Sequence, residues 1–534
     1  MAGKRLQNVP IRPWVPGWLG IWIAFIIMLP IIFINGTYTG SITEISGTLG
    51  VLSEDISMAY YATSVGMAVA YPIVPRIKAV ITTKTVLLAD LLLQVLLSFI
   101  CARAGQMEII IACSFLIGFL KAFAMLEIII MIRPFFSPRN IRSEFYAYFY
   151  PIVFSAGQIS MVLTAELAYR YQWQYMYYFV ILLLLISILL ILVFFRYGQQ
   201  KITIPLKEID GQSILLIAVT LLMVIYAATY GKTQDWFSSR KILLYTLAAP
   251  LLLWLFIFRQ STRKNPYIRL EILNQSKALI GYFFMMLVMF LSASSSLLTP
   301  YLTSVLRTDS VHANSIYLWM LPGFILGAFI CFWWFRWQRW RFRYLIGTGM
   351  SCFVLYLALI YFGVSPSGTY RMLFLPMVLR GMGMMMLFIA FGVYVVEDLA
   401  PQLFIYNAFF LIACRSAIAP ALGSSFFNNL LYRMQLSNMD RLSDNMTLLN
   451  PLAAQQYSET FQKSLAQGNG AVEAGQLAVN GLYTTLQTQS LLLSIKAIAG
   501  YVLIFAIAVT IASCFIPFHK TLKVAIVRTG EDMV

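Results

Sequence analysis

Six polar residues lie within long apolar runs of the sequence, where they could bind an ion or a charged substrate. They are Lys121, Glu127, Arg380, Arg415, Asn35 and Asn407. A charge at the centre of a membrane helix costs about 2.5–3.5 kcal/mol on insertion scales, so each ionisable residue is a functional candidate. Arg380 and Arg415 could hold an anionic substrate group, and Glu127 could bind and release a proton. The alternatives are ion pairs between helices for the cations and a cytoplasmic-interface position for Glu127.

Lys121 and Glu127 would share one helix without pairing directly. Six residues of helix separate them by about 9 Å of rise and a rotation of about 240°. Such a pair does not meet as an i,i+4 pair does. We therefore expect each to find a partner on another helix, with Arg380 and Arg415 as candidates from the second half of the chain.

Other kinds of chemistry have little support in the sequence. The six cysteines have no metal-ligand spacing and there are two histidines, so we predict neither a metal site nor a cofactor. No G-x-x-x-x-G-K-[ST] loop suggests direct use of ATP. A membrane-embedded enzyme would need a Ser/His/Asp or paired-Asp constellation in its helices, and none is evident. The protein is therefore predicted not to be an enzyme.

Composition determines the class of protein. The 534 residues are 60% hydrophobic and 11% charged, with a mean hydropathy of +0.78, whereas ordinary soluble domains carry about 25% charged residues. Apolar runs of about 20 residues recur, which predicts an all-α polytopic membrane protein. Lysine and arginine, which give a net charge of +17, lie mainly in alternate loops. This favours contact with anionic lipid headgroups over nucleic acid and puts both termini in the cytoplasm.

These elements divide into fourteen predicted spans and three parts. A polar turn, Gly231–Ile242, joins two apolar runs that form a central insert. We predict a six-helix half at 1–200, the two-helix insert at 201–270 and a second six-helix half at 271–534. The spans are 17–40, 57–76, 84–103, 107–132, 144–168, 174–197, 211–230, 241–259, 277–300, 313–335, 344–364, 370–397, 403–432 and 496–517.

Two further features support this division. Lys121 lies near Gly118 in the fourth span, and Arg380 lies beside Gly381 in the fourth span of the second half, as a weak internal repeat would give. Paired halves around a cavity are the common plan of secondary transporters. The hydrophilic segment 433–495 is predicted to face outward as two short amphipathic helices, broken near Gly468–Gly470.

Several motifs resemble one transporter family. The turn GKTQDWFSSRKI at 231–242 is followed by Asn265-Pro266 and by Leu270–Leu273, and Tyr171-Gln172-Trp173 opens the sixth span. These resemble the major facilitator superfamily, specifically the fourteen-span drug:proton antiporters of the EmrB/QacA type. The resemblance implies proton-coupled multidrug efflux by alternating access across a bacterial inner membrane. It also implies a periplasmic membrane-fusion adaptor and, through it, an outer-membrane channel.

The sequence departs from that family at its coupling motifs. The glycine-rich loop after span two reads PIVPRIKAVITTK at 72–84, and the Arg-x-x-Gln-Gly motif of span four reads SFLIG at 114–118. The span-one acidic residue has no equivalent, Asn35 being the nearest. The resemblance thus predicts transport and leaves the coupling residue open. An uncoupled lipid flippase and an organic-anion or sugar transporter of the same fold remain alternatives.

Overall fold

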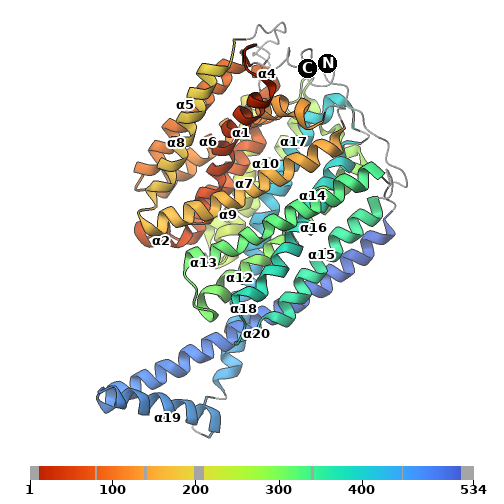
Figure 1. Ribbon diagram of the computed structural model, residues 1–534. Helices are drawn as coiled ribbons and strands as arrows, with labels where there is room; N and C mark the ends of the chain where they lie inside the picture. Colours follow the sequence, from red (N-terminus) through yellow and green to blue (C-terminus); the bar gives the residue numbers. More distant parts are fainter. Residues whose placement is uncertain are drawn as a thin grey trace.

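The structure is a computed structural model that describes residues 11–78, 81–137, 141–197, 210–337, 342–397, 399–444, 446–447, 449–516 and 518. Apart from one isolated β-bridge, the regular structure in these residues is helical. Thirteen of these helices are long and apolar enough to cross a membrane. Figure 1 shows them packed side by side in one bundle. The predicted all-α membrane fold is confirmed.

The described residues up to Tyr197 form eight helices. They are α1 (Gly17–Thr39), α2 (Ile42–Leu49), α3 (Ser53–Ala70), α4 (Val74–Lys78), α5 (Thr83–Arg103), α6 (Met107–Phe136), α7 (Arg142–Arg170) and α8 (Gln174–Phe194). The helices α9 (Gly211–Tyr230) and α10 (Arg240–Thr262), joined through the 3-10 turn η2 (Trp236–Ser238), are called the insert here after the predicted division, and the parts before and after them are called the first and second halves.

The second part has longer and more interrupted helices. Its main elements are α11 (Ser276–Ala293), α13 (Ser310–Ser315), α14 (Met320–Trp337), α15 (Phe342–Gly363), α16 (Phe374–Val396), α17 (Phe404–Ile412), α18 (Ala419–Ser443), α19 (Pro451–Ala466) and α20 (Ala471–Phe515). Short 3-10 or π segments join several of them: η4 (Ser294–Leu297), η5 (Tyr301–Val305), η6 (Ile316–Trp319), η7 (Tyr370–Leu373) and η9 (Ala413–Ile418).

The second predicted span, 57–76, needs correction. Its helix α3 starts earlier and ends at Ala70, and a turn then leads into the short α4. Glu54 and Asp55 lie in its first turn, and most of its later residues are buried. It packs against α6 and α9, so protein surrounds much of it. This polar start explains why α3 occupies the expected place yet is not among the thirteen apolar spans.

Close helix contacts recur in the two halves of the bundle. A Cβ atom on Gly118 of α6 would lie 1.9 Å from the Thr63 carbonyl oxygen of α3. A Cβ atom on Gly381 of α16 would lie 2.6 Å from the Met320 carbonyl oxygen of α14. In each case only glycine allows the two backbones to approach so closely. The repeated packing is what two related halves would produce.

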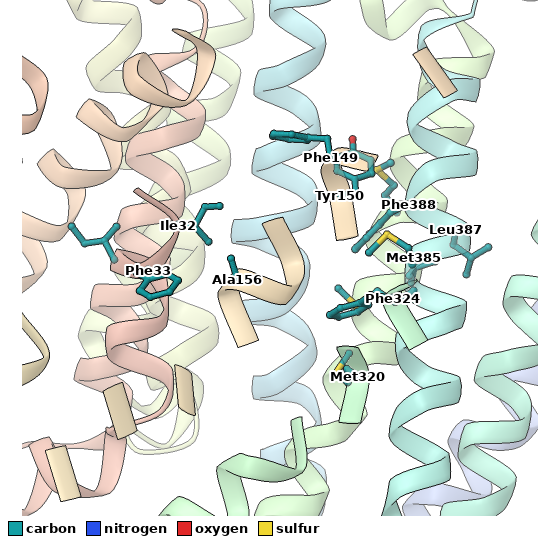
Figure 2. Packing of buried hydrophobic residues seen from close by; sticks show 14 of the residues in the cluster. Ile32, Phe33, Phe149, Tyr150, Ala156, Met320, Phe324, Met385, Leu387 and Phe388 are labelled. Carbon is teal, nitrogen blue, oxygen red and sulfur yellow. The ribbon is translucent and has the colours of Figure 1, made fainter. Parts of the chain in front are cut away.

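The apolar core extends across both halves (Figure 2). The long helix α7 contacts α1 on one side and α14 and α16 on the other. Phe154 of α7 stacks on Phe388 of α16 with ring centroids 5.2 Å apart, and it also lies 5.9 Å from the ring of Phe324 in α14. Aromatic packing of this kind stabilises the contact between the halves beyond the area that it buries.

The bundle has two distinct ends. We call the end that carries Lys78, Lys84, Arg142 and Lys277 the basic end. The opposite end carries α19 and is called the hairpin end (Figure 1). At the basic end Lys277 of α11 pairs with Glu397, which follows α16, at 3.2 Å.

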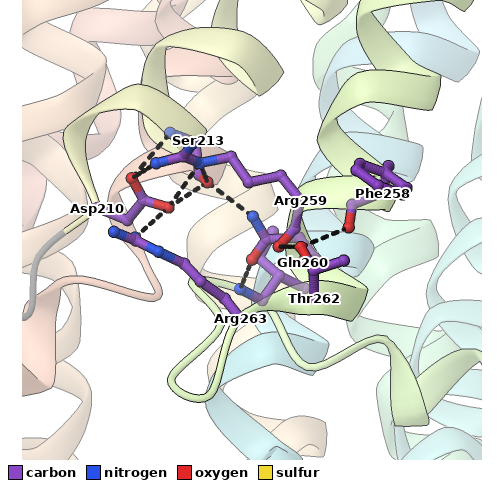
Figure 3. Close-up of polar contacts among 8 residues, drawn as sticks. Asp210, Ser213, Phe258, Arg259, Gln260, Thr262 and Arg263 are labelled. Carbon is purple, nitrogen blue, oxygen red and sulfur yellow. Dashed lines mark hydrogen bonds and ion pairs between the residues drawn. The ribbon is translucent and has the colours of Figure 1, made fainter.

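A polar cluster holds the two helices of the insert together at the basic end (Figure 3). Asp210 precedes α9 and accepts hydrogen bonds from Arg259 at 3.0 and 3.1 Å, and it also pairs with Arg263. Ser213 binds the same carboxylate and accepts from Gln260 at 2.7 Å. Burial opposes the ionised form of Asp210, but the hydrogen bonds from Arg259 and Ser213 outweigh it and hold its pKa below the usual range.

The insert is tied to the first half at both of its ends. Tyr230, at the end of α9, donates a hydrogen bond to Asp55 of α3. Tyr267, which follows α10, donates to the Val69 carbonyl oxygen, also in α3. The α9 helix additionally packs against α18. The insert therefore covers the α3 side of the boundary between the two halves.

The hydrophilic segment 433–495 forms a helical hairpin that extends beyond the bundle (Figure 1). A turn near Gly468, whose φ is +91°, separates α19 from α20. The predicted break is therefore present, but the prediction of two short helices is wrong for the second one. It is the start of α20, whose 45 residues continue without interruption through the last span. At about 1.5 Å per residue such a helix is about 68 Å long.

Candidate functional site

A cavity of about 610 Å³ lies at the centre of the bundle, between α6 and α7 on one side and α16, α17 and η9 on the other. Among its described lining residues there is no carboxylate, but five side chains are cationic. These are Lys121, Arg133, Arg142, Arg380 and Arg415. The cavity reaches the basic end, where α6 ends and α7 and α17 begin. Both halves thus supply positive charge to one shared space.

Apolar but polarisable side chains form much of the remaining wall. Aromatic rings present flat faces on which an apolar ring can stack, and methionine thioethers adapt to irregular shapes. The rings belong to Tyr60, Tyr71, Phe145, Tyr146, Phe149, Tyr150, Phe154, Tyr317 and Phe404, and the thioethers to Met67, Met125, Met161, Met289, Met320 and Met384.

Arg380 is fixed in place but retains a donor without an acceptor. It is 7% exposed, and its Nη2 donates to the backbone oxygen and hydroxyl of Ser292 at 3.0 and 2.9 Å. Nη1 lies 3.2 Å from the sulfur of Met320. Its buried Nε has no hydrogen-bond partner among the described residues. A planar guanidinium held in this way is suited to bind a carboxylate, sulfonate or phosphate.

Lys121 lies on the α6 side of the cavity and is 4% exposed. Within the described part of the chain, no hydrogen bond or ion pair involves its ammonium group, so the expected interhelical partner is not found there. An ammonium group that is removed from water without a counter-ion is costly. An anion in the cavity would supply that missing partner.

Arg415 is positioned by an irregular helix segment. It lies in the π segment η9, and such bulges occur frequently at functional sites. Its guanidinium lies 5.4, 5.7 and 5.8 Å from the ring centroids of Phe388, Tyr150 and Phe154. These contacts hold the cation against aromatic faces of both halves and do not neutralise its charge.

Arg142 lies at the mouth of the cavity at the basic end. Its Nη1 donates to the Val396 carbonyl oxygen at 3.0 Å, and its guanidinium lies 4.0 Å from the ring centroid of Phe404. The first contact joins α7 to α16 and the second joins α7 to α17. This arginine therefore spans the two halves where the cavity opens.

The other residues singled out from the sequence lie in different places. Asn407 is on the cavity wall, and its side-chain oxygen accepts from the Tyr282 hydroxyl at 2.6 Å. Asn35 is in α1, but its side chain lies outside the described residues. Glu127 is not on the cavity wall. Its carboxylate accepts from Lys78 at 3.1 Å and Thr83 at 3.2 Å near the basic end.

Three candidate residues were not identified from the sequence. Arg133 and Arg142 lie just outside the apolar runs in the sequence, but helices α6 and α7 include them and bring both to the cavity. The third, Asp90, is a buried carboxyl in α5. A single acidic residue within the apolar run TVLLADLLLQVLLSF, with Gln94 one turn later, was the signal that could have identified it.

A second cavity of about 540 Å³ lies toward the hairpin end. Residues from α3, α9, α18 and α20 line it, mostly with hydroxyl and amide groups. Tyr60 lines the central cavity and its neighbour Tyr61 lines this one, where the Tyr61 hydroxyl lies 2.9 Å from that of Ser424. This tyrosine pair and the adjacent α18 backbone lie between the two spaces. The central cavity therefore extends from this tyrosine pair toward the basic end.

Comparison with known proteins agrees with this architecture. The family model described as Major Facilitator Superfamily matches residues 19–424, whereas no curated protein matches the chain. A crystal structure of the nucleoside transporter NupG is similar with 15% identity and a TM-score of 0.52, covering 93% of this chain and 99% of that one.

Two POT transporter structures are also similar. A POT family transporter in complex with 5-aminolevulinic acid has 16% identity and a TM-score of 0.56, covering 93% of this chain and 96% of its own. A mutant of the peptide transporter POT in complex with alafosfalin has 15% identity and a TM-score of 0.54, with coverage of 93% and 98%. At such identities the similarity concerns the fold alone.

Proposed function

Because the chain belongs to the major facilitator superfamily, we propose that this membrane transporter exports amphipathic organic anions by alternating access. The observation that supports this most strongly is the charge of the central cavity. Five cationic side chains line it, and no described carboxylate accompanies them. Two unit charges 4 Å apart interact with about 4 kcal/mol at an effective dielectric constant of 20. An anion entering the cavity would therefore bind more strongly than a cation of the same shape.

The walls favour a substrate that also has an apolar part. A volume of about 610 Å³ lies within the range of about 300–1,000 Å³ that is typical of small-molecule sites. Tyr150, Phe154 and Tyr317 offer ring faces beside the guanidinium groups of Arg415 and Arg380. An aromatic carboxylate or sulfonate could use both features at once. We therefore narrow the expected multidrug efflux of the EmrB/QacA type to efflux of anionic compounds.

Direction, orientation and coupling are further parts of this proposal. We place the basic end in the cytoplasm because positive residues favour that side, which puts the hairpin end outside a bacterial inner membrane. We also propose proton antiport, as the family resemblance implies. The sequence singled out Glu127 as the coupling carboxyl, but its pairing with Lys78 and Thr83 supports a structural role at the basic end.

The hairpin of α19 and α20 is the proposed docking element for a periplasmic membrane-fusion adaptor and, through it, an outer-membrane channel. Leu465, Val472 and Leu477 are 39%, 80% and 42% exposed on it. Farther along α20, Leu482 is partly buried and Leu486 is 7% exposed. The available apolar surface therefore lies toward the hairpin tip.

A binding assay with matched compounds tests the substrate class. The purified transporter is titrated with an aromatic carboxylate, its neutral amide and its amine analogue, which share one ring system. We expect the carboxylate to bind about tenfold or more tightly than the amide, because a charge-assisted hydrogen bond contributes about 1.5–3 kcal/mol. The amine should bind weakest. Preference for the amine would overturn the proposal.

A further inference from the structure

A row of buried polar side chains lies along one face of α5, away from the central cavity. Asp90, Gln94 and Ser98 are spaced four residues apart and therefore share one helix face. They are 4%, 0% and 0% exposed. Gln94 donates one hydrogen bond to Asp90 at 3.0 Å. The other carboxylate oxygen of Asp90, the amide oxygen of Gln94 and the hydroxyl of Ser98 are all buried without a hydrogen-bond partner among the described residues.

No described cation neutralises Asp90. Helices α6 and α8 pack against α5. On α6, Lys121 and Arg133 line the central cavity, Glu127 binds Lys78, and Glu108 is exposed near the start of the helix. None of these groups has an ion pair or a hydrogen bond with Asp90.

The remaining titratable groups near this face are also engaged elsewhere. On α5 itself, Lys84 donates to two carbonyl oxygens of the α8 end, and Arg103 is exposed. Cys101 contacts Cys113 of α6 and Tyr177 of α8. The α8 helix carries no charged residue; its other titratable groups are Tyr175 and Tyr178 near its start. Asp90 is thus surrounded by apolar and neutral groups.

An ionised carboxylate in these surroundings would be strongly destabilised, because neither water nor a counter-ion replaces its lost hydration. A carboxyl group that has bound a proton is neutral and can also donate a hydrogen bond. Burial of a lone carboxyl among unsatisfied acceptors is costly in a purely structural role, which makes a functional role the better explanation.

We propose that Asp90 is the proton-binding carboxyl through which this transporter couples to a proton gradient, with Gln94 and Ser98 completing its polar path. This inference rests on the proposed transport function. The carboxylate takes up one proton from water on one side of the membrane and releases it to the other side, so the carboxyl group returns to its initial state. No further reactant is needed.

The position of α5 allows such a step to influence the substrate cavity. Asp90 lies seven residues beyond the start of α5 at Thr83, about 10 Å along the helix from the basic end, and Ser98 lies about 12 Å further. The neighbouring α6 packs on α5 and also supplies Lys121 and Arg133 to the cavity. A change in the charge of Asp90 would alter the α5–α6 contact and, through α6, the cavity wall.

The test separates coupling from transport in proteoliposomes. Asp90→Asn keeps the size and polarity of the side chain but cannot bind the proton. We expect it to reduce accumulation of an aromatic carboxylate driven by a pH gradient about tenfold or more, while exchange of labelled for unlabelled carboxylate without a gradient persists. Glu166→Gln, an exposed position on α7, is the matched control and should retain both activities. If Asp90→Asn keeps gradient-driven accumulation, or if Glu127→Gln loses it instead, the proposal is wrong.

Infrared spectroscopy of the purified protein tests, without any substrate, whether Asp90 carries a proton. We expect a carbonyl stretching band of a protonated, buried carboxyl group at neutral pH that disappears in Asp90→Asn and persists in Glu127→Gln. If wild-type protein moves none of the carboxylates but shows this band, the proposed substrate class fails and the proton site stands. A wild-type spectrum without the band, or with a band unchanged in Asp90→Asn, overturns the proton site whatever the transport result.

Discussion

Arg380 is the single residue on which the proposed anion binding depends most. Ser292 and Met320 orient its guanidinium, and its Nε has no described acceptor. We predict that Arg380→Gln lowers the affinity for an aromatic carboxylate about 10- to 100-fold, since a hydrogen bond to a charged group contributes about 1.5–3 kcal/mol. The affinity for the neutral amide should change little. Calorimetric titration of both ligands measures the difference.

Arg371→Gln provides the control for that variant, because Arg371 is exposed in η7 and outside the cavity. It should bind both ligands as the wild type does. An equal loss of affinity for carboxylate and amide in Arg380→Gln would mean that this arginine supports the cavity structurally and does not bind the anion.

Some of the candidate residues could be identified from the sequence and others could not. Lys121, Arg380 and Arg415 stood out because ionisable groups are rare in apolar runs, and the structure puts all three on the cavity wall. The direction in which Glu127 points depends on how α6 is rotated against its neighbours, which no single sequence contains. Asp90 was overlooked although its sequence surroundings are equally apolar.

Among the helical elements, the insert is stabilised by one buried carboxylate. Asp210 has a 3% exposed side chain, accepts hydrogen bonds from Arg259 and Ser213, and forms an ion pair with Arg263. We predict that Asp210→Asn lowers the free energy of unfolding by about 2 kcal/mol, less than for a fully buried pair because both arginines are partly exposed. Thermal unfolding in detergent measures it, with Asp309→Asn at an exposed helix cap as the control.

The same cluster predicts a dependence on pH. The pKa of Asp210 is lowered in the folded state, so its stabilising effect is complete above the unfolded value of about 3.9 and is lost as the pH falls through the lower folded value. The stability difference between wild type and Asp210→Asn should therefore be constant from pH 8 to about pH 5 and shrink below about pH 4. A difference that persists unchanged in acid would show that the charge is not what stabilises the insert.

The hairpin is the element that tests the proposed adaptor. Asn438 donates to Ser494 at 2.8 Å, and Thr484, Gln487 and Thr488 line the second cavity, so a deletion should spare these residues. We predict that removing residues 447–480 and joining the ends abolishes co-purification of the adaptor but leaves carboxylate flux in proteoliposomes within about twofold of wild type. Adaptor binding that survives the deletion would assign docking to another surface.

Helix existence was easier to predict than helix extent. Apolar runs located the spans, but they did not show where α20 begins. This helix continues from the hairpin into the membrane, and no glycine or proline occurs in it between Gly481 and Gly500. Its glycines stay helical through packing, for example Gly500 against Tyr361 of α15. Tertiary contacts of this kind override local propensity and are not visible in a single sequence.

At the scale of the whole molecule, two cavities lie on either side of Tyr60 and Tyr61. The central one extends to the basic end, and the second one, toward the hairpin end, is separated from it by this tyrosine pair and the α18 backbone near Ser424. A transporter that alternates between two states must separate the residues of this barrier in one state. In the same state the two halves must come closer together at the basic end, where Arg142 contacts Val396 and Phe404. The two-half plan suggested by the sequence fits such a motion, since both contacts join the first half to the second.

Flux of one anion and its neutral isostere through the reconstituted protein tests the central claim most directly. Proteoliposomes are preloaded with an aromatic carboxylate, and the initial rate of exchange with the labelled carboxylate is compared with that of its amide for wild type, Arg371→Gln and Arg380→Gln. The account predicts saturable carboxylate exchange in the first two proteins, about tenfold or more slower exchange in Arg380→Gln, and little amide exchange in any of them. Exchange of the amide or an amine as fast as the carboxylate in wild type, or carboxylate exchange unaffected by Arg380→Gln, would contradict it.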